Sequence, residues 1–145
     1  MLFRSLDEQA RGVSLPFVQR DARTGTLIGS TRYGAIVREH RRLEIGWTWI
    51  ARTHHRTGVN TESKYLLLRH AFEVLGMQRV ELKTDALNAR SRAAIARIGA
   101  TQEGIFRRHI ITASGRLRDT VYFSVVVDEW PAVRSRLERM LVRPA

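Results

Sequence analysis

The sequence predicts an α/β (α+β) fold, in which helices flank a mixed β-sheet. Some segments alternate apolar and polar residues with the period of a strand, and others repeat apolar residues with the period of a helix. The two kinds follow one another in the order β-β-β-α-β-α-β-β-α. With 145 residues and 43% hydrophobic content, the chain is expected to form one domain, residues 1–145, with a core of its own.

The first three elements are predicted to be strands. Residues 14–20 and 26–33 flank a turn-forming stretch, 22–25, and are expected to form a hairpin. In residues 43–50, one face of the alternating pattern carries the apolar side chains Leu43, Ile45, Trp47 and Trp49. We therefore expect both tryptophans to lie in the core.

A long helix over 61–75 is predicted next, and Gly76 is expected to end it. Its apolar side chains form a wide stripe, so the helix is expected to be well buried; they are Tyr65, Leu66, Leu67, Leu68, Ala71, Phe72 and Leu75. A short strand follows at 79–84. Asn88 is then expected to cap a second helix that runs to Ile98.

The last third of the chain is predicted to contain a hairpin and a final helix. The hairpin strands are 105–111 and 117–127, joined by the turn-forming residues 113–115. Asp128 is expected to cap an amphipathic helix whose apolar side chains are Trp130, Val133, Leu137 and Met140. The arginines on this helix are expected to form a solvated face.

The chain is strongly basic. It has 25 Lys and Arg residues against 14 Asp and Glu, and the net charge of +11 favours polyanionic partners such as nucleic acid, ribosomes or a nucleotide-bearing cofactor. Without cysteine it can form no disulfide and no thiolate nucleophile. No segment approaches the roughly 18 apolar residues of a membrane span, and the start lacks the apolar run of a signal peptide. We therefore expect a cytoplasmic protein without a membrane partner.

The junction between the third strand and the long helix is the best candidate for a binding site. A basic loop, 51–57, leads into Gly58 and the start of the helix. Unpaired N–H groups point outward at a helix N-terminus, and the helix dipole there favours negative charge. The junction is therefore predicted to hold a phosphate group. No metal site is predicted, because the adjacent His54 and His55 diverge and have no third ligand at suitable spacing.

Four stretches, in order, resemble the GNAT family of N-acetyltransferases, in its RimJ/RimL branch of ribosomal-protein N-terminal acetyltransferases. They resemble the family's fourth strand, its pyrophosphate loop, its Asn-x-x-Ser…Gly stretch and its closing hairpin with the last helix. These stretches are 44–47 (EIGW), 55–60 (HRTGVN), 88–91 (NARS) with 98–100 (IGA), and 103–107 (EGIFR) with Asp119 and 128–130 (DEW). The resemblance covers the chain from Ser14 onward and implies a mostly antiparallel central sheet.

The resemblance implies transfer of an acetyl group from acetyl-CoA to a primary amine, of a protein N-terminus or a small molecule, by direct attack. It implies that acetyl-CoA is held by Trp49, Ile50, His55, Arg56, Thr57, Gly58, Val59, Asn60, Thr61, Asn88 and Ser91. Ser91 would protonate the leaving sulfur, and Glu44 or His109 would act as the base. The sequence departs from the family pattern at His55 and Asn60. It also departs at Ile95, where many members have a tyrosine that acts as a general acid.

The family also implies a strand and one or two helices before the hairpin that begins at Ser14. Residues 6–11 are therefore expected to be the tail of a helix, and the chain to be N-terminally short. The missing part usually forms one wall of the acceptor site. That wall would then be built differently, for example by a partner subunit of a homodimer, and association with ribosomes is a further expectation.

Two other functions stay open. The chain could bind CoA without turnover, or it could be a basic module that binds RNA or ribosomes. The second is disfavoured if the tryptophans lie in the core, because single-strand binding needs exposed aromatic side chains. The individual residues have alternatives too: Asn88 could be only an N-cap, Ser91 a surface residue, Glu44 the partner of an arginine, and His109 an ordinary sheet residue.

Overall fold

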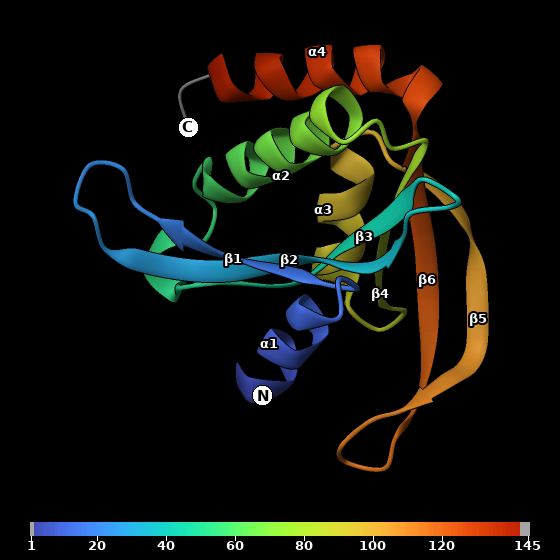
Figure 1. The fold of residues 1–145 in the computed structure, drawn as a ribbon. Coiled ribbons are helices and arrows are strands. Elements are labelled where there is room, and N and C mark those ends of the chain that lie inside the picture. The colour runs from blue at the N-terminus through green and yellow to red at the C-terminus, as the bar shows by residue number, and fades with distance from the viewer. Residues whose placement is uncertain (1, 143–145) are drawn as a thin grey trace.

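The computed structural model describes residues 2–142, and its centre is one six-stranded sheet in the order β1-β2-β3-β4-β6-β5 (Figure 1). The β3–β4 pair is parallel and every other neighbouring pair is antiparallel, so the predicted mixed, mostly antiparallel sheet is confirmed. The strands are Leu15–Arg20 (β1), Leu27–Val37 (β2), Arg42–Ile50 (β3), Arg79–Asp85 (β4), Thr101–Ile111 (β5) and Leu117–Val126 (β6).

The α-helices of the described residues cover both sides of the β1–β3 part of the sheet. They are Leu2–Ala10 (α1), Val59–Arg69 (α2), Ala89–Arg97 (α3) and Trp130–Val142 (α4). Helices α2 and α4 lie on one side and α1 on the other (Figure 1). The predicted order of elements is confirmed, and α1 occupies the place expected for a helix tail. Apolar side chains from the sheet, α2 and α4 form the core, among them Leu43, Leu68, Val80, Val121 and Leu137.

Helix α2 begins two residues before the predicted start and continues as a π-helical turn, His70–Val74. Gly76 ends it in the left-handed conformation, with φ +66°, as predicted. The expected burial of the whole apolar stripe is wrong at Leu66 and Leu75, which are exposed. The π turn contributes to this at Leu75, because its extra residue rotates the side chains that follow.

The predicted role of Asp128 as the cap of the last helix is also wrong. Residues Val127–Glu129 form a 3₁₀ turn ahead of α4, and Asp128 lies inside this turn. The carboxylate of the next residue, Glu129, accepts a hydrogen bond from the Val126 N–H, at 3.1 Å. Because the 3₁₀ turn comes before α4, the carboxylate that accepts the backbone N–H belongs to Glu129 and not to Asp128.

Strand β3 contains a bulge at the tryptophans. Arg32 pairs with Gly46 and Ser30 pairs with Trp49, so two residues of β3 lie opposite one residue of β2. Trp47 has a left-handed φ of 51°. The extra residue shifts the alternation of side chains by one position. Trp47 and Trp49 therefore lie on the face where an unshifted strand would place its polar residues.

The expectation that both tryptophans lie in the core is therefore wrong. Trp47 is 52% exposed and Trp49 is 59% exposed. The Trp47 ring lies against Gly34 of β2, where an added Cβ would lie only 2.3 Å from the ring, and the Arg32 guanidinium stacks 4.7 Å above it. The bulge thus leaves two large side chains partly exposed and changes the direction of the strand.

The two parallel strands of the sheet separate soon after they meet. Strand β3 pairs with β4 only from Arg42 to Glu44, opposite Arg79 to Glu81. Beyond Glu44 they diverge, so residues 45–50 have no neighbouring strand on that side. The alternation of apolar and polar residues along β3 and β4 carries no sign of this separation, which determines where the binding site can lie.

Candidate active site

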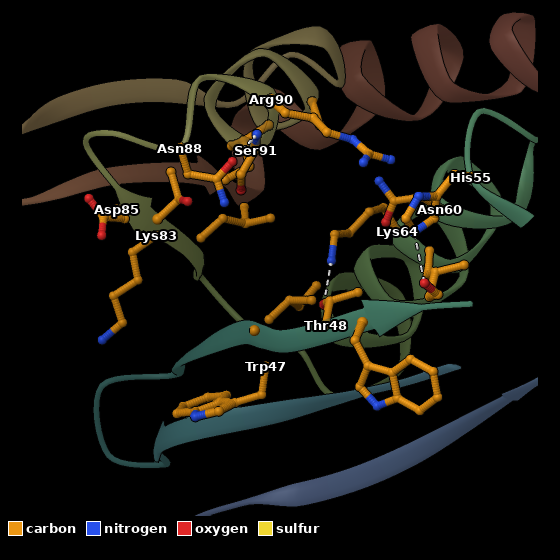
Figure 2. Close-up of a pocket in the computed structure, with 18 of the residues that line it drawn as sticks. Trp47, Thr48, His55, Asn60, Lys64, Lys83, Asp85, Asn88, Arg90 and Ser91 are labelled. Atoms are coloured by element: carbon orange, nitrogen blue, oxygen red, sulfur yellow. Dashed lines mark hydrogen bonds between the residues drawn. The ribbon is translucent and has the colours of Figure 1, made fainter. Parts of the chain in front are cut away.

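A cleft of about 560 Å³ occupies the opening between β3 and β4 (Figure 2). One wall is the outer half of β3, the other is β4 with the start of α3, and the loop before α2 closes one end. Eight of the residues predicted to hold the cofactor line this cleft: Trp49, Ile50, His55, Arg56, Thr57, Asn60, Asn88 and Ser91. Residues that are far apart in the sequence therefore meet in a single site.

The loop before α2 is held by hydrogen bonds to its own backbone and to β3. His55 Nε2 donates to the carbonyl oxygen of Ile50 at 2.8 Å, and Thr57 Oγ1 donates to the carbonyl of His54 at 2.6 Å. Arg56 has a left-handed φ of 59°, so the chain turns sharply at this residue. These contacts fix the loop against the end of the strand and direct it into the helix.

The start of α2 is a regular helix N-terminus without a side-chain cap. Gly58 has helical dihedral angles, φ −69° and ψ −7°, and no side chain caps the helix from this position. A Cβ at Gly58 would meet nothing within 4 Å. Asn60 lies in the first turn of α2, and the left-handed residue of the loop is Arg56.

Val59 and Thr61 belong to the predicted cofactor site but face away from the cleft. Val59 lines a separate cavity between β1 and α2. Thr61 is buried, and its Oγ1 accepts a hydrogen bond from Arg97 at the end of α3, at 3.2 Å. Alternate residues of a helix turn point in different directions, so a continuous stretch such as 58–61 cannot all face one ligand.

On the opposite wall, Asn88 caps α3 as predicted. Its Oδ1 accepts a hydrogen bond from the Ser91 N–H at 3.0 Å. Both side chains also line the cleft, so the capping interaction leaves the Asn88 amide nitrogen and the Ser91 hydroxyl directed toward it (Figure 2). The two roles considered for Asn88, cap and ligand contact, are therefore compatible in this geometry.

Comparison with protein families identifies the fold that carries this cleft. Residues 2–101 match the model of the acetyltransferase (GNAT) domain. The chain belongs to the GNAT family. The predicted class of enzyme, an N-acetyltransferase, is confirmed by this match and by the relatives that share it.

Two curated relatives of this GNAT chain are proteins of Bacillus subtilis (strain 168). One, YoaA, is named an uncharacterized N-acetyltransferase and is 30% identical over 86% of the chain and 68% of its own length. The other, YdaF, carries the provisional name of a ribosomal N-acetyltransferase and is 34% identical over 73% of the chain and 57% of its own length. The chain thus spans between 57% and 68% of the length of these relatives.

Among solved structures, the GNAT fold is shared with RimJ of Mycobacterium smegmatis, determined in complex with CoA-disulfide. The TM-score is 0.82 and the identity 27%, over 95% of this chain and 65% of that one. Within residues 2–142, no helix has both the length and the apolar character needed to cross a bilayer.

Two of the residues predicted as catalytic in this GNAT chain do not line the cleft. Glu44 is 4% exposed, and its Oε2 lies 2.9 Å from the Nζ of Lys83, so its partner is a lysine and not the arginine that was considered. Burial raises the pKa of Glu44, and Lys83 opposes that shift. Glu44 does not line the cleft itself, but its carboxylate lies beside two residues that do, Lys83 and Gly46.

His109 lies on β5, outside the cleft. Its Nδ1 is 3.1 Å from the Thr120 hydroxyl, and its ring makes edge contacts with Phe106 and Tyr122. An irregularity in the pairing of β5 with β6 places it there. Phe106 pairs with Thr120 and Ile110 with Arg118, so three residues of β5 lie opposite one of β6. The structure thus separates His109 from Ser91 and from the loop.

Lys64 also lines the cleft, although it was not among the predicted site residues. It projects from α2 toward β3, is 7% exposed, and donates a hydrogen bond to Thr48 Oγ1 at 3.2 Å (Figure 2). Burial lowers its pKa to about 8. A signal was present, because Lys64 is one of only two lysines and lies one helical turn before Leu68, on the apolar stripe of the helix.

The charged residues of the cleft are predominantly basic. The only acidic side chain among the described lining residues is Asp85, which forms an ion pair with Arg116. The basic ones come from the loop, α2, α3, β4 and β6, and they are His54, His55, Arg56, Lys64, Lys83, Arg90 and Arg118. A cleft with this excess of positive charge attracts anionic ligands and repels polycations.

Proposed function

We propose that this chain transfers an acetyl group from acetyl-CoA to the primary amine of a protein N-terminus or of a small molecule. The observation that supports this most directly is the single cleft between the separated strands, with a basic loop and an uncapped helix N-terminus at one end. Such an arrangement suits a long, thin cofactor whose phosphates lie at the surface and whose reactive end lies inside. The family of the chain, and a structural relative solved with a CoA derivative, agree with it.

The residues of the cleft divide the binding task between its two walls. The backbone N–H groups at the start of α2 and the Arg56 guanidinium would hold the diphosphate. The Asn88 amide would bind an amide of the pantetheine arm. Backbone N–H groups near Trp49 and Ile50, on the edge of β3 that β4 has left, would donate to the thioester carbonyl oxygen as negative charge develops there.

Bound acetyl-CoA supplies the acetyl group as a thioester. The amine nitrogen forms a bond with the carbonyl carbon, the carbon–sulfur bond breaks, and the ammonium proton passes to a base while the sulfur gains a proton. Ser91 would donate the proton to sulfur, and Glu44, acting through Lys83 and water, would serve as the base in preference to His109, which lies outside the cleft. Holding the two reactants in position would account for much of the rate.

Thermal unfolding with and without acetyl-CoA tests the donor half of this proposal. A ligand at 100 times its Kd should stabilise the protein by about 2.7 kcal/mol. If millimolar acetyl-CoA leaves the melting temperature unchanged, the proposal is wrong. If the temperature rises, thiol release measured with a panel of amines and N-terminal peptides separates an active enzyme from a chain that binds CoA without turnover.

The variant Gly58→Val tests whether the loop and the start of α2 hold the phosphates. Because an added Cβ there meets nothing in the free protein, the variant should fold normally and lose the thermal shift. The matched control is Gly104→Val on β5, where an added Cβ also meets nothing within 4 Å. A full thermal shift in Gly58→Val would place the diphosphate elsewhere.

The RimJ/RimL branch, with a protein N-terminus as acceptor and a ribosome as partner, is the finer form of this proposal. It is supported by the sequence stretches described above and by the names of two relatives. Acetylation of N-terminal peptides in preference to polyamines and aminoglycosides would support it. The homodimer and the cytoplasmic location stay predictions.

One observation favours a second function, the binding of single-stranded RNA. The tryptophans that were expected in the core are exposed, and Trp47 stacks with an arginine. A labelled single-stranded RNA distinguishes the two functions. Binding that persists at about 200 mM salt and is lost in Trp47→Ala with Trp49→Ala would support the RNA module, since non-specific binding weakens steeply with salt.

A further inference from the structure

Lys64 carries a buried positive charge that no described carboxylate balances. Its side chain is more than nine-tenths buried, and within residues 2–142 no carboxylate forms an ion pair with it. The second lysine of the cleft, Lys83, shows the usual solution, since the Glu44 carboxylate lies 2.9 Å from its Nζ. A buried charge without a partner is costly, so an unpaired lysine at this position requires an explanation.

The orientation of Lys64 is set by a chain of hydroxyl groups. The Thr31 hydroxyl donates to the carbonyl oxygen of Gly46 at 3.3 Å, and the hydroxyls of Thr31 and Thr48 are 2.8 Å apart. Because the Thr31 proton is used on Gly46, the Thr48 hydroxyl donates to Thr31 and accepts from Lys64. This chain holds the lysine against the bulge of β3 and takes up one of its three donors.

The remaining donors of Lys64 are directed into the cleft between β3 and β4. Strand β3, which packs against the lysine, offers it only the Thr48 hydroxyl. The loop, α3 and β6 contribute further positive or titratable groups, and the charged groups around the cleft are His54, His55, Arg56, Arg90 and Arg118, with Lys83 and Asp85 from β4. Asp85 is engaged by Arg116, so among the described residues that line the cleft there is no free carboxylate to balance Lys64.

We propose that the Lys64 ammonium is a binding group of the acyl-donor site and takes an anion of the bound coenzyme as its counter-ion. This inference rests on the proposed function. Among the anions of the coenzyme, which also include the phosphate on its ribose, the two candidates are the diphosphate and the thiolate that is present after the acetyl group has left. Either would pair with an ammonium that is already desolvated and oriented, and pairing would hold the lysine in its protonated form.

Calorimetric titration with acetyl-CoA, which carries no thiolate, tests pairing of Lys64 with the diphosphate. Near pH 8 about half of the Lys64 side chains are neutral in the free protein, so pairing with an anion should take up about half a proton per site. Titrations at pH 8 in two buffers of different ionisation enthalpy measure this uptake. At pH 6.5 Lys64 is already charged, and its contribution to proton uptake should vanish.

Two substitutions at Lys64 separate the charge from the packing. Lys64→Met removes the charge at similar length and should weaken binding about 10-fold to 100-fold, the range for a hydrogen bond to a charged group. Lys64→Arg keeps a permanent charge and should retain most of the affinity without the proton uptake. Arg139→Met, an exposed residue of α4, controls for the loss of one positive charge.

Two further ligands identify which anion is bound. If the diphosphate pairs with Lys64, acetyl-CoA, CoA and desulfo-CoA should all lose affinity equally in Lys64→Met. If the thiolate pairs with it, only CoA should lose affinity, and the loss should grow as the pH rises toward the pKa of the thiol. Both results would support the proposal.

The proposal is overturned if Lys64→Met, shown by its thermal melt to be folded, binds all three ligands as the wild type does with the same proton uptake. Failure of the wild-type protein to bind any of them would instead refute the proposed function. The two failures are therefore distinguishable. Since the variant removes an unpaired buried charge, it should be at least as stable as the wild type, so loss of binding could not be attributed to unfolding.

Discussion

The two halves of β3 differ although they belong to one strand. The inner half, around Leu43 and Glu44, is buried and pairs with strands on both sides, and its buried charge, on Glu44, is neutralised by Lys83. The outer half, from Gly46 to Ile50, has lost β4 as a neighbour, exposes two tryptophans and faces an unpaired lysine. The inner half has the features of a stable core and the outer half those of a binding site.

The difference arises from one inserted residue and one separation of strands. The bulge at Trp47 reverses which side chains face α2, and the divergence of β4 releases the backbone groups of residues 45–50 on one edge. Unpaired edge groups are normally a liability, because they invite pairing with another chain. Here they lie within a cleft, where an extended ligand could take the place of the missing strand.

Truncation of a core residue in the inner half should have the largest effect on stability. Leu43 is 1% exposed, and Leu43→Ala should lower the free energy of unfolding by about 2–5 kcal/mol, from lost burial and the cavity left behind. Trp49→Ala in the outer half removes a larger side chain but should cost less than about 1 kcal/mol, because that side chain is mostly exposed. Urea unfolding measures both, and equal losses would contradict the contrast between the halves.

The pH dependence of stability should reveal the charge beneath the outer half. Burial lowers the pKa of Lys64 to about 8, whereas the pKa of an unfolded lysine is about 10.4. Below pH 8 the lysine is charged in both states and its burial penalty is fully present. Between pH 8 and pH 10.4 only the unfolded chain stays protonated, so the penalty disappears and the native state gains stability.

The measurement compares the wild type with Lys64→Met over this pH range. The free energy of unfolding of the wild type should rise relative to that of the variant, by up to about 3 kcal/mol. Parallel pH profiles would show that Lys64 is solvated or neutral throughout.

The packing of Trp47 across the bulge should have an intermediate effect. A Cβ at Gly34 would overlap the Trp47 ring, so Gly34→Ala should destabilise the protein by about 1–3 kcal/mol. In a Trp47→Ala background the same substitution should cost almost nothing, because the overlapping ring is gone. The double-mutant cycle measures this coupling, and additive effects would mean that Trp47 does not rest on Gly34 in solution.

The smallest effect concerns the wall opposite β3. Asn88→Ala should cost about 1 kcal/mol through loss of the helix cap, whereas Asn88→Asp keeps a capping oxygen and should be nearly neutral for stability. If the amide nitrogen binds the pantetheine arm, Asn88→Asp should still weaken binding of acetyl-CoA. Unchanged affinity in the aspartate variant would leave Asn88 with the capping role alone.

Local rules predicted those features that depend on neighbouring residues. The order of the elements, the left-handed Gly76 and the Asn88 cap each follow from side-chain period or backbone conformation within a few positions. The loop before α2 was identified in the same way. The local rules failed for Trp47 and Trp49, because a bulge depends on the register with β2 and leaves no mark in the alternation of one strand.

The candidate site was only partly predicted, because local rules do not show which side chains of separate elements lie opposite one another. Family resemblance pointed to the loop, Asn88 and Ser91, which the fold does bring together. It did not separate Asn60, which lines the cleft, from Gly58, Val59 and Thr61, which do not. It also did not reveal that Glu44 pairs with Lys83 or that His109 lies outside the cleft. Each of these depends on which side chain of another element lies opposite.

The sequence by itself determined the class of fold, the family and the location of the loop that enters α2 beside the cleft, because periodicity, caps and ordered motifs are contained in short stretches of chain. Only the tertiary structure decided that the tryptophans are exposed and that Lys64 is buried with no carboxylate paired to it among residues 2–142. These properties depend on strand register and on burial, and burial is a relation between elements that are distant in the sequence.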